Sequence, residues 1–165
     1  MSATPRLSLP FIVPGQAQKE MFHNEALQLL DALVAGAVEE PPRNDPPATP
    51  AMGAVYIVGV SPTGEWASQA NAVASFSDGG WRYLAPVDGM TMLVRSTGVH
   101  AVYRQSAWEL GVVRAVSVTI GGQQVVGSRA AAVSAPAGGA VADVESRIAI
   151  AAILAALRGH GLIAT

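Results

Sequence analysis

The sequence contains no cysteine, which excludes disulfide bonds, thiolate metal sites and cysteine nucleophiles. Of its 165 residues only 13% are charged and 5% are aromatic, whereas an average soluble domain has roughly 25% charged residues. A chain so poor in charge has few side chains with which to cover an apolar surface in water. We therefore expect part of its apolar surface to be buried against other chains, which favours an oligomer.

The sequence also lacks a basic excess and a long hydrophobic run. The formal net charge is −2 and the isoelectric point is near 5.9, so no positive field attracts phosphate groups and nucleic acid is not an expected partner. The longest apolar run, residues 148–157, falls well short of the ~20 residues that a membrane-spanning helix needs. Residues 1–15 show no secretion signal. We expect no membrane span and synthesis in the cytoplasm.

No constellation of catalytic residues is present. The three histidines, His23, His100 and His160, lie in separate segments without the spacing of metal ligands. There is no G-x-S-x-G nucleophile motif and no phosphate-binding loop. We therefore predict no catalytic residue, no metal, no cofactor and no enzymatic activity. Glycan hydrolysis is the remaining enzymatic alternative, although it requires a cleft that so small a domain can scarcely form.

Residues 1–38 are predicted to form an attachment arm followed by a helix. Three prolines between residues 5 and 14 hold residues 1–18 extended. From about residue 19 or 24 onwards, apolar residues recur at steps of three and four, which predicts one apolar stripe on a helix. The stripe consists of Met21, Ala26, Leu29, Leu30, Leu33, Val34 and Ala37. Polar residues are expected mostly away from it, namely His23, Glu25, Gln28 and Asp31.

A proline-rich linker is predicted at residues 39–52 and a β-hairpin module at 53–111. The linker follows from five prolines in EEPPRNDPPATP, which no helix accommodates. In the module the apolar residues alternate, and SFSDGGWRYL is echoed by VYRQSAWEL. Each copy is typical of two strands joined by a tight turn, at 78–80 and 105–107 respectively. We predict a small antiparallel sheet or a partly closed barrel of hairpins.

Residues 112–140 are predicted to form a second hairpin and a Gly/Ala-rich linker, and residues 141–165 a C-terminal oligomerisation helix. Gly121-Gly122 occupies the place of a two-residue turn. The helix has Asp143 as its N-cap and stop signals at Gly159 and Gly161. The predicted fold class is therefore α+β.

The C-terminal helix is apolar around its whole circumference between residues 148 and 157. Such a helix must be surrounded, and a single sheet would cover only one of its sides. We predict self-association in a bundle about a common axis, and the alternative is packing within the chain across its own sheet. The residues predicted to form the seam are Ile150, Ile153, Leu154 and Leu157. Burying three or four large aliphatic residues per chain contributes on the order of 8–10 kcal/mol before the entropy cost.

Two interpretations of the tryptophans remain open. Trp66, Trp81 and Trp108 all fall in the hairpin module. They either form the core of a sheet whose other residues are mostly Ala and Val, or present aromatic platforms to sugar rings. In the second case at least one of them contacts a carbohydrate ligand.

The chain resembles a family of phage and gene-transfer-agent structural proteins, found in tail-fibre or spike subunits, that carries a domain of unknown function. The resemblance covers roughly residues 9–111. It rests on LPFIVPGQAQKEMFHNEALQLLDALV, on GAVYIVGVSPTGEWASQANAVASFSDGGWRYLAPVDGM and on AVYRQSAWEL. The closing segment with ESRIAIAAILAALRGHGLI is similar to the ends of fibre proteins from phages of alphaproteobacteria. Small departures occur at Glu20 and Phe22.

The resemblance implies a homotrimeric tail fibre of a phage-like particle, assembled in the bacterial cytoplasm and contributing to host-cell attachment. It supplies no active site. The arm is expected to dock onto a baseplate or hub protein of the particle. The residues expected to dock are Leu9, Pro10, Phe11, Ile12, Pro14, Gln16, Gln18 and Lys19. The alternative function is a carbohydrate-binding spike module that uses exposed Trp or Tyr side chains.

Overall fold

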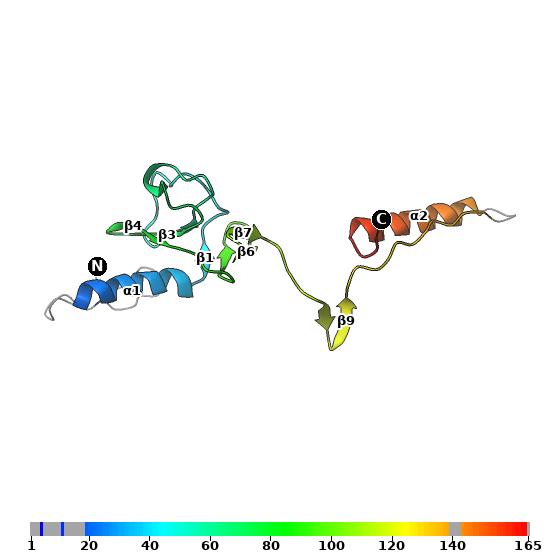
Figure 1. Ribbon diagram of the computed structural model, residues 1–165, viewed down its shortest axis with the longest axis horizontal. Helices are drawn as coiled ribbons and strands as arrows, with labels where there is room; N and C mark the ends of the chain where they lie inside the picture. The colour runs from blue at the N-terminus through cyan, green and yellow to red at the C-terminus, as the bar shows by residue number, and fades with distance from the viewer. Residues whose placement is uncertain (1–3, 5–10, 12–18, 139–142, 165) are drawn as a thin grey trace. The chain divides into compact units, whose positions relative to one another are not determined.

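The computed structural model describes residues 4, 11, 19–138 and 143–164. The chain divides into two compact units, Met1–Val112 (unit 1) and Val113–Thr165 (unit 2). The described elements of unit 1 are α1 (Lys19–Val34), β1 (Ala37–Val38), β2 (Val55–Ile57), the 3-10 turn η1 (Gly64–Trp66), β3 (Val73–Ser77), β4 (Gly80–Leu84), β5 (Thr91–Val94), β6 (His100–Arg104) and β7 (Ala107–Leu110). Those of unit 2 are β8 (Val118–Ile120), β9 (Gln123–Val126) and α2 (Val144–Gly159), several of which are labelled in Figure 1.

The strands of unit 1 form two open sheets. One has the order β1-β5-β6-β7 and the other β2-β3-β4. All pairs are antiparallel except β1 with β5, which is parallel. The predicted α+β class is confirmed. Of the two predicted forms, small sheets are present, and no barrel closes among the described residues. The chain between β4 and β5 contains Pro86 and a turn closed by Met90 N donating to Val87 O at 2.9 Å, and it separates the two sheets.

The predicted hairpin turns are present at the predicted places. Ser77 pairs with Gly80 in β3–β4, which leaves Asp78-Gly79 as the turn. Arg104 pairs with Ala107 in β6–β7, and the intervening Gln105 and Ser106 have φ values of 48° and 65°. In unit 2 the β8–β9 turn is Gly121-Gly122, with φ values of 56° and 80°. Two consecutive positive φ values are typical of the type I′ turn, whose twist matches that of the flanking strands.

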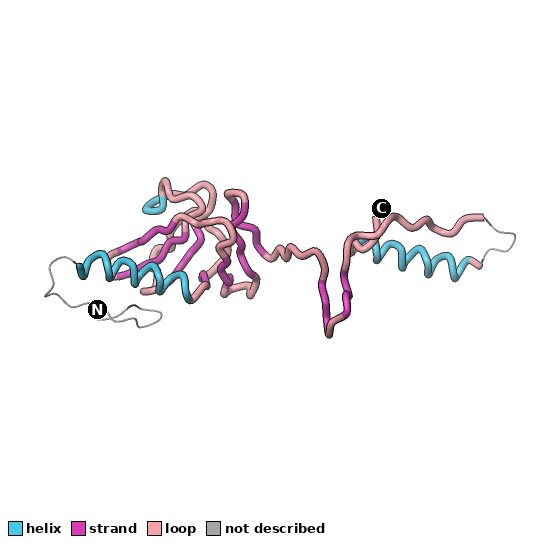
Figure 2. The backbone as a smooth tube through the Cα atoms, turned by 60° about the horizontal axis from the view of Figure 1, so that its bottom comes forward, coloured by secondary structure: helices cyan, strands magenta, loops and turns pink. Residues whose placement is uncertain are grey.

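Strand β2 lies at the centre of unit 1, because both of its faces are buried. Val55 and Ile57 point to one side, where they join Val38, Met92 and other residues of the first core cluster. Tyr56 points to the opposite side and joins a second cluster. Successive side chains of a strand alternate between faces, so one short strand anchors two layers of core. Figure 2 shows the strands of this unit with α1 beside them.

The second cluster is built mainly from aromatic rings. Trp66, from η1, is fully buried, and its ring centroid lies 5.8 Å from Tyr56 and 5.0 Å from Trp81. The loop that carries η1 is fastened to β4 because Trp81 Nε1 donates to Glu65 Oε2 at 3.1 Å and the Tyr83 hydroxyl donates to Glu65 O at 2.6 Å. Tilted and edge-on ring pairs at such distances add to the stabilisation from burial. Trp66 therefore closes the outer face of the β2-β3-β4 sheet.

Helix α1 buries two polar side chains against the rest of unit 1. The buried residues include Gln28 and Asp31, at 7% and 2% exposure, whereas Leu30 and Val34 are 48% and 69% exposed. The Asp31 carboxylate accepts a hydrogen bond from Thr4 Oγ1 at 2.8 Å, which gives the buried charge a polar partner. Leu30 and Val34, two members of the predicted apolar stripe, therefore lie on the outer side of the helix. The helix also ends at Val34, before the predicted residue 38, because the positive φ of Gly36 terminates it.

The proline-rich segment after β1 lies along β2. Arg43 forms a parallel bridge with Val58, and its carbonyl accepts from Gly59 N at 2.6 Å. Gly59 has no room for a Cβ atom, which would collide with the Asn44 side chain. Prolines are tolerated here because an edge segment need not use every backbone donor. Part of the segment predicted as a linker thus belongs to the packed structure of unit 1.

Replacing Trp66 by alanine is predicted to destabilise unit 1 by about 3–5 kcal/mol, because the side chain fills the centre of an aromatic cluster. Urea unfolding followed by tryptophan fluorescence measures this, since the remaining Trp81 and Trp108 both lie in unit 1. Val87→Ala, at a side chain 65% exposed, is the matched control and should change stability by less than about 0.5 kcal/mol. A Trp66 variant as stable as the control would show that the cluster is not structural.

Candidate functional site

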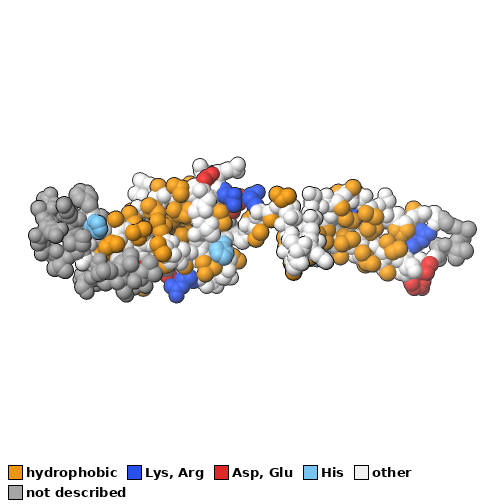
Figure 3. Space-filling view, turned by 90° about the horizontal axis from the view of Figure 1, so that it is seen from below, with side chains coloured by type: hydrophobic (Ala, Val, Ile, Leu, Met, Phe, Trp, Pro, Cys, Tyr) orange, Lys and Arg blue, Asp and Glu red, His pale blue; other side chains and the backbone are white. Residues whose placement is uncertain are grey.

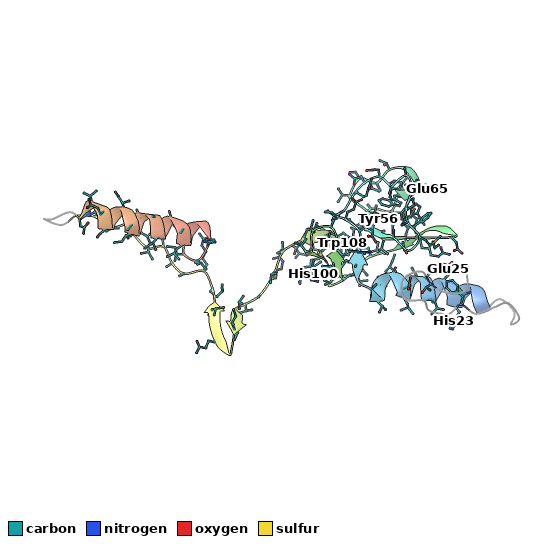
Figure 4. The ribbon with its side chains drawn as sticks, turned by 180° about the vertical axis from the view of Figure 1, so that it is seen from behind. His23, Glu25, Tyr56, Glu65, His100 and Trp108 are labelled. Carbon is teal, nitrogen blue, oxygen red and sulfur yellow. The ribbon has the colours of Figure 1, made fainter. Side chains whose placement is uncertain are left out.

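The described residues contain no group of three or more His, Asp or Glu side chains that could hold a metal ion. His23 and His100 belong to different elements of unit 1, α1 and β6 (Figure 4). Neither of the two described helices is long and apolar enough to cross a membrane. The features that stand out are instead surfaces: the aliphatic side of α2, the outer side of α1 and a hollow beside Trp108.

Helix α2 begins as the sequence predicts. Asp143 is the N-cap, and its Oδ1 accepts from Ser146 N at 2.9 Å. This hydrogen bond from the backbone is the main cause that lowers the pKa of the Asp143 carboxyl below its usual value. Arg158 lies in the last turn, where a cation is favourable beside the negative end of the helix. The start of α2 is therefore fixed locally and needs no contact from another part of the chain.

One side of α2 is covered by the segment that precedes it in unit 2. Residues 129–138 run beside the helix: Arg158 Nη2 donates to Val133 O at 2.5 Å, Arg147 Nη2 donates to Gly138 O, and Arg129 Nε donates to Ile163 O at 3.2 Å. Leu154 is only 5% exposed as a result. We call residues 129–138 the strap; Figure 2 shows it alongside the helix.

The remaining surface of α2 stays uncovered. Ile148, Ile150 and Ile153 are 65%, 42% and 58% exposed. The alanines between and beside them are exposed as well, namely Ala149, Ala151, Ala152, Ala155 and Ala156. No charged residue occurs between residues 148 and 157. Figure 3 shows hydrophobic side chains gathered on the visible side of this unit, where the acidic and basic side chains that can be seen lie near one end.

The four predicted seam residues therefore have different surroundings. Ile150 and Ile153 are exposed and available to another chain, whereas Leu154 faces its own strap and Leu157 is half-buried. Ile148 was not among the predicted seam residues, although it is the most exposed isoleucine of the helix. Ile150 and Ile153 lie on one side of the helix and, with the exposed alanines beside them, form the surface that we call the α2 face. Ile148 lies near the opposite side, where it lines a hollow with Ala135 and Pro136 of the strap.

Helix α1 presents a smaller apolar surface outward and is held in place by an ion pair. Arg82, on β4, donates from Nε and Nη2 to the two carboxylate oxygens of Glu25 at 2.8 and 2.6 Å. Hydrogen bonding from Arg82 is the largest cause that lowers the pKa of Glu25. A bidentate pair fixes direction as well as distance. It orients α1 so that Leu30 and Val34 remain outside; Figure 4 labels Glu25.

Most of the predicted docking residues cannot be placed on this surface. Leu9, Pro10, Ile12, Pro14, Gln16 and Gln18 lie outside the described residues. Of the others, Phe11 is half-buried and Lys19 is the first residue of α1. The docking role of the arm stays a prediction.

The three tryptophans differ in accessibility. Trp66 is fully buried, so it offers no face to a ligand, and Trp81 is half-buried in the same cluster. Trp108 lines a hollow of about 270 Å³ together with Pro42, Asn44, Gly59, Val60, Asn71 and Ala107. Its Nε1 donates to Asn71 O at 2.8 Å, which holds the ring in one orientation. Trp108 is therefore the candidate platform; Figure 4 labels it.

The sequence did not single out the two asparagines of this hollow. Asn71 has a φ of 63° and donates from Nδ2 to Ser106 O at 3.4 Å, so it links the β2–β3 connection to the tip of the β6–β7 hairpin. Asn44 Oδ1 accepts from Ser61 N at 3.0 Å. Asparagine tolerates positive φ better than most residues, but no local pattern places these two side chains together. Only the folded arrangement of the loops does so.

The fold and these surfaces define a small α+β protein with one packed unit and one unit whose aliphatic surface is largely uncovered. Residues 23–109, more than half of the chain, match the family described as "Protein of unknown function (DUF2793)". The chain belongs to this family. The matched residues all lie in unit 1. No curated protein matches the sequence.

Replacing Glu25 by glutamine is predicted to weaken unit 1 at neutral pH, by no more than about 1 kcal/mol because the pair is partly exposed. Since the pKa of Glu25 is lowered in the folded protein, its stabilising contribution is present above the unfolded value of ~4.3 and is lost as pH falls through the folded value. The difference in free energy of unfolding between variant and parent should therefore be present at pH 7 and disappear below pH ~4.

Urea unfolding followed by tryptophan fluorescence at both pH values measures this difference. Asp88→Asn, which removes one acidic charge at an exposed position, is the control and should show no comparable effect at pH 7. A stability difference for Glu25→Gln that is constant between neutral and acidic pH would contradict the assigned role of the carboxylate.

Proposed function

We propose that the protein is a structural component of a phage-like particle, a homotrimeric tail fibre that is anchored to the baseplate and contributes to host-cell attachment. The observation that carries the assembly is the α2 face, with its exposed isoleucines and without a charge between residues 148 and 157. The assignment to a tail fibre rests on the resemblance of the opening and hairpin motifs to fibre and spike subunits.

The chemistry of the α2 face supports self-association over binding to a charged partner. Aliphatic surface exposed at this density is unfavourable in water, and a second copy covers it without desolvating any charge. The alanines allow two helices to approach closely. Ile150 and Ile153 stand three residues apart, and isoleucine at both core positions of a parallel bundle favours three or four strands over two. These features support three copies of α2 about a common axis.

The N-terminal part supports an anchoring role in the same assembly. Its arm contains prolines that restrict the chain to extended conformations, which reduces the entropy lost when it docks in a groove of another protein. Helix α1 follows directly and exposes Leu30 and Val34. We propose that the arm and this side of α1 contact a baseplate or hub protein, while unit 2 holds the three chains together.

Light scattering of the purified full chain coupled to size exclusion tests the assembly. The expected mass is about three times the 16.9 kDa of one chain. Ile153→Asp is predicted to shift the mass to that of one chain at micromolar concentration, because a carboxylate would have to be buried in each copy of the seam. Ile153→Val, which retains an aliphatic side chain, is the control and should remain trimeric.

A parent protein that elutes as one chain at the same concentration would contradict the assembly. Binding of a labelled antibody against unit 1 to intact particles tests where the protein lies. Label on tail tips or tail bases is expected, and particles without label would contradict a tail component.

A second candidate function is recognition of a host surface polysaccharide, and the hollow beside Trp108 favours it. An oriented aromatic ring flanked by asparagine amides offers both stacking for a sugar ring and hydrogen bonds for its hydroxyl groups. The volume of about 270 Å³ is at the lower end for small-molecule sites and suits one sugar unit at a time. A trimer would present three such hollows, which raises avidity for a repeating glycan.

For this second candidate, addition of oligosaccharides of glucose, galactose and N-acetylglucosamine is predicted to shift the indole N–H resonance of Trp108 in two-dimensional NMR spectra. Val60→Arg should abolish the shift because Val60 lines the hollow and is 74% exposed, so the change fills the site without disturbing the core. Val87→Arg, also exposed, is the matched control. Equal shifts in both variants, or none in the parent, would contradict saccharide binding at this site.

A further inference from the structure

The β8–β9 hairpin of unit 2 has one aliphatic and one polar face. Val118 pairs with Val126, and Ile120 pairs with Gln123. Cross-strand partners share a face and neighbours along a strand alternate, so Val118, Ile120 and Val126 lie on one side together with Gln123. Thr119 pairs with Gln124, which places these two polar residues on the other side. The register shifts between Val118 and Thr119, and Val125 is the extra residue that has no partner across the strands.

The aliphatic side of this hairpin is uncovered in the single chain. Every residue of both strands is exposed, with Val118 at 41%, Ile120 at 66% and Val126 at 42%. An isolated two-stranded hairpin is at best marginally stable in water, and it needs further strands or a packing partner on its apolar side. The described part of unit 2 supplies neither, since the strap covers α2 and leaves both strands exposed.

The composition of residues 115–128 favours one kind of partner. Between Ala115 and Ser128 the sequence contains no charged residue, so a partner gains nothing here from charge complementarity. Val113 and Val116, just before β8, are 87% and 93% exposed and extend the aliphatic surface. A surface that is aliphatic and uncharged is best matched by another of the same kind, and copies of this chain supply one at equal concentration.

The available area agrees with this choice. Five valine and isoleucine side chains lie in the hairpin and in the segment just before it. Burying each of them removes on the order of 100 Å² of apolar surface from water. Alone they fall short of the ~800 Å² per partner of a standard stable interface. Together with the α2 face, which belongs to the same unit, they reach that size. The hairpin and α2 would thus supply two contacts between the same copies of the chain.

We propose that the β8–β9 hairpins of neighbouring copies of this chain pack their aliphatic faces, Val118, Ile120 and Val126, against one another and form a second inter-chain contact beside the α2 bundle. This inference rests on the proposed assembly, because it takes the copies that α2 brings together as the partners. The contact would stabilise an uncharged hairpin, because each copy would cover the aliphatic face of its neighbours.

Single cysteines test this proposal, because the natural sequence has none. Ile120→Cys places a thiol on the aliphatic face and Thr119→Cys places one on the polar face one residue away. The purified full-length variants are treated with a short bis-maleimide at the concentration at which light scattering gives the trimer mass. Several-fold more covalently joined chains are expected for Ile120→Cys than for Thr119→Cys on denaturing gels. Val126→Cys and Gln124→Cys form a second pair with the same expected contrast.

The possible results separate this proposal from the proposed function. Cross-linking on the aliphatic face with little on the polar face supports the contact. Absence of cross-linking at both faces in a trimeric protein overturns the hairpin contact while leaving the α2 assembly intact. Equal cross-linking at both faces also overturns it, because the contact would then not be specific to one face. A monomeric parent protein overturns both the assembly and the hairpin contact.

Discussion

The uncovered aliphatic surface of unit 2 is the constraint on which the interpretation depends. Ile148, Ile150 and Ile153 remain exposed even though the strap already covers the side of α2 that holds Leu154. Residues 148–157 contain no charged side chain that would favour contact of this surface with water. In the single chain the strap makes hydrogen bonds to the helix, but the described isoleucines and valines of this unit stay largely exposed. The proposed association with further copies would remove that surface from water.

Unit 1 has the opposite character, because its own elements cover its core. Strand β2 is buried on both faces, Trp66 closes one layer, and the Arg82–Glu25 pair fixes α1 against β4. Such a unit is suited to presenting surfaces in fixed positions: the outer side of α1 and the hollow beside Trp108. In the proposed fibre, unit 2 supplies the association and unit 1 supplies the contacts with other molecules.

Local sequence patterns predicted the local structure well. The turns at Asp78-Gly79 and Gly121-Gly122 and the Asp143 cap depend on residues that are adjacent in the chain, and all are present. The α+β class follows from the change in apolar spacing between the helices and the hairpins. These features can be predicted without knowing any contact between residues distant in the sequence.

Features that depend on distant contacts were not predictable in the same way. Apolar spacing predicted a stripe on α1 but not which side of the helix is buried. Asp31 and Glu25 find their partners in Thr4 and Arg82, which are distant in the sequence, and these contacts accompany an orientation in which Leu30 and Val34 lie outside. Leu154 was assigned to the seam because the sequence does not reveal that the strap runs beside α2. Likewise, the hollow beside Trp108 arises where loops separated in sequence meet. The sequence left open a sheet or a partly closed barrel, because the hairpins gave no signal of their division into two sheets.

Hydrogen exchange of the backbone amides of α2, followed as a function of protein concentration, tests the central claim most directly. If copies of the chain shelter this helix, protection of residues 148–157 should rise with concentration, while protection of β2 and β3 in unit 1 stays constant. Protection of α2 that does not change with concentration, whether high or low, would contradict an account in which other copies of the chain cover the aliphatic surface.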